Sequence, residues 1–63
     1  MNDKWIVLHE RIDDELSEIL INKKAITCVH QNNHVNYKTC IYIIDRGYVY
    51  VEEGYDEIVR LLR

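Results

Sequence analysis

The strongest constraint on the fold is a pair of β-rich segments that follow one another closely. Residues 39–44 and 48–51 are rich in isoleucine, valine and tyrosine, and Asp45, Arg46 and Gly47 separate them. Two such segments, separated by three residues that end in glycine, are typical of a β-hairpin in which the glycine supplies the left-handed residue of a bulged turn. The sequence therefore predicts an antiparallel hairpin with Arg46 at its centre.

The register of this hairpin assigns its side chains to two faces. Pairing about Arg46 opposes four couples of residues: Ile41 with Val51, Ile43 with Val49, Tyr42 with Tyr50, and Ile44 with Tyr48. Because successive side chains of a strand alternate between its faces, one face is aliphatic. The other face, called the tyrosine face below, holds Tyr42, Ile44, Tyr48 and Tyr50.

The rest of the chain predicts further strands and one helix. Residues 4–9 and 25–30 are β-rich, and the polar stretch 11–15 suits a turn. We expect Trp5 in the core. After Gly54, apolar residues recur at helical spacing, with acidic residues first and arginines last. This helix is expected to cover the aliphatic face.

Residues 12–22 fit two patterns. Four apolar residues fall at helical spacing, with Asp13 as a possible N-cap: Ile12, Leu16, Ile19 and Leu20. The short aliphatic run at 19–21, ended abruptly by Asn22, suits a strand instead. Periodicity alone leaves both interpretations open.

Length and composition predict one small domain without a catalytic site. The 63 residues include no proline and two glycines, so no stretch resembles a linker and we expect a single domain over residues 1–63. Its predicted class is α+β: a small antiparallel β-sheet of four to five strands, with one C-terminal helix packed on one face. Glycine-rich phosphate loops, Gly-x-Ser-x-Gly and His-Glu-x2-His are missing from the sequence. We therefore expect no enzymatic activity and no cofactor.

Charge restricts the expected partners. Eight lysines and arginines stand against eleven aspartates and glutamates, a formal net charge of −3, which argues against nucleic-acid binding. No apolar run approaches the ~20 residues of a membrane span, the first residues do not resemble a signal peptide, and two cysteines suit a reducing cytoplasm. The acidic residues form two clusters, Glu10, Asp13, Asp14, Glu15 and Glu18, and Glu52, Glu53, Asp56 and Glu57. These clusters suit either solvated turns or a surface that docks on a basic protein.

Four residues in the middle of the chain have the chemistry of metal ligands. Cys28, His30, His34 and Cys40 form a Cys-x-His-x3-His-x5-Cys string, and both residue types bind tetrahedral zinc. If the flanking strands pair about His34, Cys28 lies opposite Cys40, within range of a disulfide. However, the string lacks the Cys-x2-Cys spacing of common zinc sites. We therefore predict no metal, with these four residues as the candidates for a metal site.

Several short segments resemble one family. They are Ile19-Leu20-Ile21-Asn22, Ile26, Thr39-Cys40-Ile41-Tyr42, the stretch 47–53, and Asp56-Glu57-Ile58. This pattern, from Trp5 onward, resembles the small SwrD/FlbD-like flagellar and swarming accessory proteins, which have relatives in bacterial and phage genomes. The chain departs from the family at its turn, which is Asn-Gly there, at Gly54, which is serine there, and in the longer loop 31–36. The resemblance implies a strand over residues 17–21 and a small accessory protein that acts by binding, without catalytic residues.

The tyrosine face supports the functional prediction. Tyrosine is enriched at protein interfaces, and apolar patches of several hundred Å² mark interaction surfaces. Tyrosines are also good strand formers whose hydroxyls can simply face water. We predict a non-catalytic accessory protein that associates with itself, as a homodimer or a larger assembly, or with one host protein. Two alternatives stay open: a phage-encoded anti-defence inhibitor, similar to anti-CRISPR proteins, that binds a host nuclease or effector, and a zinc-stapled small domain.

Overall fold

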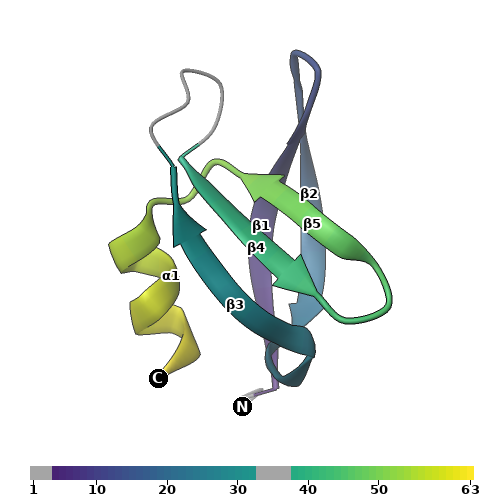
Figure 1. Cartoon of the computed structure of the whole chain (residues 1–63). Helices are drawn as coiled ribbons and strands as arrows, with labels where there is room; N and C mark the ends of the chain where they lie inside the picture. The colour runs from purple at the N-terminus through teal and green to yellow at the C-terminus, as the bar shows by residue number, and fades with distance from the viewer. Residues whose placement is uncertain (1–3, 33–37) are drawn as a thin grey trace.

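The computed structural model describes residues 4–32 and 38–63, and it forms one sheet and one helix (Figure 1). The elements are β1 (Trp5–Ile12), β2 (Glu15–Asn22), the 3₁₀ turn η1 (Lys23–Ala25), β3 (Ile26–Gln31), β4 (Thr39–Ile43), β5 (Gly47–Val51) and α1 (Tyr55–Leu62). All five strands are antiparallel, in the order β2-β1-β5-β4-β3. The predicted α+β class is confirmed, and the ambiguous segment is a strand. Among the described residues, no helix has the length and hydropathy that a membrane crossing requires.

The sheet curls because its two outer strands are joined by a very short connection. From Asn22 to Ile26 the chain can span at most about 14 Å, whereas the outer strands of a flat five-stranded sheet lie about 19 Å apart. The connection is also fixed at both ends: Lys23 N–H donates to the Lys4 carbonyl at 2.7 Å, and Ala25 accepts from Ile44 N–H at 2.8 Å. As a result, β1 and β2 cross behind the layer of β3, β4 and β5 (Figure 1).

The core fills the concave side of this curled sheet. Its buried members come from four strands and the helix: Ile6, Leu8, Ile21, Ile41, Ile43, Val49, Val51 and Ile58. The aliphatic residues of β4 and β5 all belong to it, as alternation predicts. α1 contributes the fully buried Ile58 and the partly buried Leu62, so the helix does cover the aliphatic face.

The register of the β4–β5 hairpin differs from the prediction by two residues. Ile41 lies opposite Val49, Tyr42 opposite Tyr48, and Ile43 opposite Gly47. The turn is centred on Asp45, which itself takes a positive φ of 69°, and Gly47, at φ 100°, is the first residue of β5. Since the shift is even, every side chain keeps its predicted face.

The pairing of β3 with β4 is also shifted, which corrects the predicted opposition of the two cysteines. Cys28 lies opposite Tyr42 and His30 opposite Cys40, after a bulge between Ile26 and Cys28. Both cysteines are free thiols. The shift is already present at Gln31 and Thr39, so the two strands pair about a centre one residue further along the chain than predicted.

Two expectations about β1 are wrong. The strand continues to Ile12, so the turn to β2 is Asp13 and Asp14 alone. Trp5 is exposed rather than buried, because Ile6 and Leu8 take the inward positions of the strand. Trp5 alternates with them and therefore points outward.

Candidate binding surface

The tyrosine face is an ordered aromatic layer on the outside of β4 and β5. Tyr42 and Tyr48 are cross-strand partners, and their rings meet edge to face, with centroids 5.0 Å apart and planes at 70°. This arrangement suits the opposite charges of ring edge and ring face. Tyr42, Tyr48 and Tyr50 nevertheless remain 37%, 59% and 40% exposed. The rings are thus held in place by one another while much of their surface stays open.

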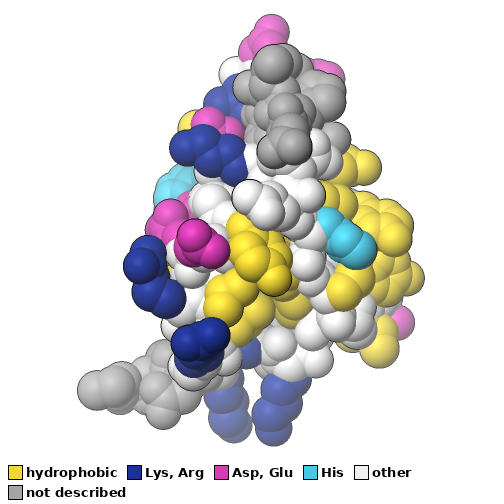
Figure 2. Space-filling view, turned by 60° about the vertical axis from the view of Figure 1, so that its left-hand side comes forward, with side chains coloured by type: hydrophobic (Ala, Val, Ile, Leu, Met, Phe, Trp, Pro, Cys, Tyr) yellow, Lys and Arg dark blue, Asp and Glu magenta, His cyan; other side chains and the backbone are white. Residues whose placement is uncertain are grey.

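Ile44, the fourth predicted residue, lies in the turn between β4 and β5. It is 55% exposed, and its backbone N–H donates to Ala25 next to β3. That bond fixes the turn against the neighbouring connection. Figure 2 shows hydrophobic side chains gathered along one flank of the molecule, with a histidine beside them.

β3 extends the same outer surface with a thiol and an imidazole. Cys28 and His30 are exposed and lie on the outward positions of the strand, opposite Tyr42 and Cys40. Cys28 Sγ is 3.2 Å from His30 Nε2, and the His30 ring centroid lies 6.5 Å from that of Tyr48. The imidazole therefore connects the thiol to the aromatic layer.

A shallow hollow of about 320 Å³ opens beside this pair. It is lined by His30, Asn32, Cys40, Tyr48 and Tyr50. Cys40 forms part of its floor and is itself buried, and this burial raises the pKa of the Cys40 thiol, with a smaller effect from nearby Cys28. Cys40 consequently stays a neutral thiol at physiological pH.

Three of the four metal candidates thus share one face. Cys28, His30 and Cys40 come together there, whereas His34 lies outside the described residues. Within residues 4–32 and 38–63, no group of three or more His, Cys, Asp or Glu side chains could hold a metal ion. One described chain therefore offers at most a pair of ligands on this surface.

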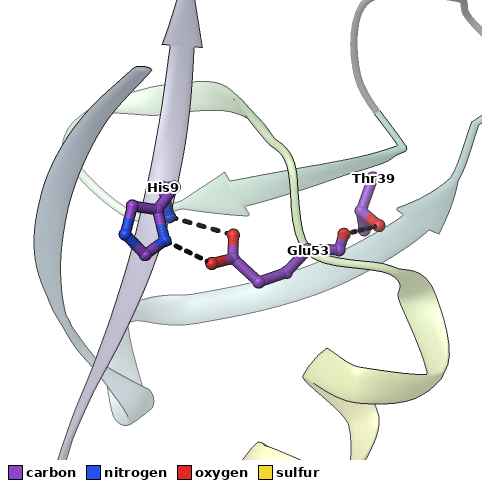
Figure 3. A network of polar contacts seen from close by, with 3 residues as sticks. All are labelled: His9, Thr39 and Glu53. Carbon is purple, nitrogen blue, oxygen red and sulfur yellow. Dashed lines mark hydrogen bonds and ion pairs between the residues drawn. The ribbon is translucent and has the colours of Figure 1, made fainter.

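A second polar cluster joins β1 to the segment before α1 (Figure 3). Glu53 accepts from the His9 backbone N–H at 2.9 Å, and its other carboxylate oxygen lies 2.6 Å from His9 Nδ1. The Glu53 carbonyl accepts from the hydroxyl of fully buried Thr39 at 2.6 Å. The hydrogen bond to Glu53 raises the pKa of His9, with smaller contributions from the charges of Glu53, Glu18 and Glu57. An open hollow of about 350 Å³ adjoins the cluster.

Sequence reasoning finds the aromatic layer but misses two contacts. The approach of Cys28 to His30 follows from their i, i+2 spacing on one strand, a signal that the register error obscured. The side chains of His9 and Glu53 are in contact although they lie 44 residues apart in the sequence, and no local pattern predicts such a contact. The two acidic clusters do converge, because residues of both act on His9.

Comparison with protein-family models, with curated proteins and with solved structures gives no match for this chain. The resemblance to SwrD/FlbD-like proteins stays a prediction from the residues.

Proposed function

We propose that this protein acts without catalysis, as a small accessory protein that binds other proteins, and that it associates with itself through the tyrosine face. The observation that carries the proposal is the exposed, mutually packed ring pair of Tyr42 and Tyr48. Large aromatic side chains that are already ordered lose little conformational freedom on binding.

The lack of charged side chains makes the tyrosine face a place where a second copy can bind with little repulsion. Every copy has a formal net charge of −3, so two copies repel each other through most of their surface. The tyrosine face, together with Cys28 on β3, contains no lysine, arginine, aspartate or glutamate. Cores of protein interfaces are depleted in charged residues in the same way.

The area of the patch sets the size of the interface. At the exposures given above, the three tyrosines present roughly 300 Å², taking ~200 Å² for a whole tyrosine side chain. A standard interface covers about 800 Å² per partner. The tyrosine face therefore forms the centre of the proposed interface, and β3 and the β4–β5 turn supply its rim.

The first test removes the two packed rings. In the double variant Tyr42→Thr, Tyr48→Thr, we expect the dissociation constant of the dimer to rise at least about 30-fold, since one central interface residue contributes ~2 kcal/mol. Light scattering coupled to size exclusion, over a concentration series, measures this change. Threonine keeps the strand propensity of the site.

Tyr55→Thr is the matched control, because Tyr55 is an exposed tyrosine on α1. We expect this variant to associate like the parent chain. An unchanged mass in the double variant would reject the tyrosine face, and a parent chain that is monomeric at every concentration would reject self-association.

The second candidate function is an anti-defence inhibitor that binds a basic surface of a host protein. It is supported by the convergence of Glu18, Glu53 and Glu57 around His9. We place it second because Glu53 is already paired with His9, as Glu52 is with Arg11. Protection of a phage against a host nuclease, lost when Glu18 and Glu57 are replaced by lysine, is its test.

A further inference from the structure

We propose that two copies of this chain share one zinc ion, and that each copy contributes Cys28 Sγ and His30 Nε2. The proposal rests on the self-association proposed above and names a ligand for the same surface. It begins from the pair itself: two side chains with zinc-binding chemistry, both exposed, with their ligand atoms 3.2 Å apart.

The spacing of the two atoms is close to what one metal ion requires. Zinc binds sulfur at ~2.3 Å and imidazole nitrogen at ~2.0–2.1 Å with tetrahedral angles, which puts the two ligand atoms about 3.6 Å apart. In the structure they are 3.2 Å apart. A small rotation of exposed side chains closes this difference, without any movement of the strand.

Cys28 and His30 supply two of the four protein ligands that a structural zinc site needs. Structural zinc is bound by four protein ligands, and the described residues contain no third one that completes the pair. Cys40 lies opposite His30 but is buried, whereas Cys28 and His30 are exposed. Within residues 4–32 and 38–63, the zinc site therefore lacks two ligands, which a second copy can supply.

A twofold symmetry axis between two copies completes the zinc site. In a symmetric dimer the same patch of each copy meets its equivalent, so an axis through the metal brings two cysteines and two histidines together. β3 is an outermost strand of the sheet, so none of the other described strands pairs with its outer edge. Tyr42 lies beside Cys28, and Tyr48 near His30, and the same axis therefore sets the tyrosines of both copies around the metal.

The charges of the completed site balance. Each Cys28 thiol gives up its proton to solvent when its sulfur binds the metal, while each imidazole binds as the neutral base. Two thiolates and two neutral imidazoles around Zn²⁺ have no net charge. Such a centre suits an interface from which water and charged groups are excluded.

The experiment titrates chelator-treated protein with ZnCl₂, and separately with CoCl₂, whose d–d absorption reports tetrahedral coordination and whose ultraviolet charge-transfer band reports thiolate ligation. We expect saturation at half a metal ion per chain. We also expect zinc to lower the dissociation constant of the dimer by at least about tenfold, through linkage of metal binding to association. Cys28→Ser and His30→Gln should each abolish both effects, with circular dichroism unchanged.

Cys40→Ser is the matched control and should keep the half-equivalent stoichiometry. One metal ion per chain in a monomer, loss of binding in Cys40→Ser, or no metal binding at micromolar concentrations would each overturn the shared site. If zinc has no effect while Tyr42→Thr, Tyr48→Thr still dissolves the dimer, the zinc site fails and the proposed function stands. If zinc binds at half an equivalent per chain and the tyrosine variants associate normally, the tyrosine face fails instead.

Discussion

Glu53 shows how one side chain can replace part of a β-ladder. The pairing of β1 with β5 ends next to His9. There the Glu53 carboxylate accepts a hydrogen bond from the His9 backbone N–H, in place of the backbone carbonyl that a longer β5 would provide. Its carbonyl satisfies Thr39, whose hydroxyl is fully buried. A buried hydroxyl without a partner would cost about 1–3 kcal/mol. One residue therefore holds β1 and β4 together at the start of α1.

The ion pair of His9 with Glu53 predicts a pH dependence of stability. Because Glu53 raises the pKa of His9 in the folded state, the stabilisation is complete below the unfolded pKa of about 6.5. It is lost as the pH rises through the higher folded pKa. The free energy of unfolding should therefore fall between about pH 6 and pH 8, measured by urea unfolding with Trp5 fluorescence.

Glu53→Gln should flatten this dependence, because glutamine keeps an acceptor for the His9 N–H but has no charge. Glu15→Gln makes the same charge change in β2 and should keep the slope of the parent chain. A slope that persists unaltered in Glu53→Gln would assign the pH dependence to another group.

At the scale of elements, the β4–β5 turn depends on two residues with positive φ. Gly47 takes φ 100° and would meet no atom within 4 Å if it carried a Cβ. Gly47→Ala should therefore cost about 1–2 kcal/mol from backbone strain alone. Asp45, at φ 69°, also has a strained backbone conformation, which glycine would relieve. Asp45→Gly should therefore be neutral or slightly stabilising. Thermal unfolding monitored by circular dichroism measures both.

Gly54→Ala is the matched control, since Gly54 has φ −71° and equally open surroundings. It should change the free energy of unfolding by less than about 1 kcal/mol. If Gly47→Ala and Gly54→Ala behave alike, the argument from backbone strain is wrong.

The same turn shows why the sequence predicts faces better than registers. Alternation assigns Tyr42, Tyr48, Ile41 and Val49 to their correct sides, because any even shift preserves it. The two-residue error arises because Asp45, not the predicted Arg46, lies at the centre of the turn. Aspartate tolerates the left-handed region less readily than glycine, so local chemistry favours the wrong centre.

The exposed Trp5 and the Cys28–His30 pair mark the limit of sequence patterns. β1 has apolar residues on both faces, so alternation cannot say whether Trp5 or Ile6 points inward. The place of the Cys28–His30 pair beside Tyr42 and Cys40 depends on the register between β3 and β4, which the sequence predicts wrongly. Both features depend on how neighbouring strands pack and pair, which the sequence of one strand does not determine.

At the scale of the whole molecule, the sheet has one narrow seam. Within the described strands, β1 and β5 share a single registered pair, Glu10 with Val51. Three ion pairs cross the same seam: His9 with Glu53 at 2.6 Å, Arg11 with Glu52 at 3.2 Å, and Glu10 with Arg46 at 2.9 Å. Charged side chains therefore attach the β1–β2 hairpin where backbone pairing is sparse.

This arrangement predicts that the hairpin opens separately when its charges are removed. In the triple variant Glu10→Gln, Glu52→Gln, Glu53→Gln, hydrogen exchange of the β1 and β2 amides should accelerate by about 3-fold or more, because the variant removes all three of these ion pairs. The amides of β4 should change less, because that strand pairs along its whole length with both neighbours. The control is the triple variant Asp14→Asn, Glu15→Gln, Asp56→Asn, which has the same change in net charge. In this control, the amides of β1, β2 and β4 should exchange at the rates of the parent chain. Equal acceleration of β4 would mean that the sheet opens as one unit, and that the seam is no weaker than the rest.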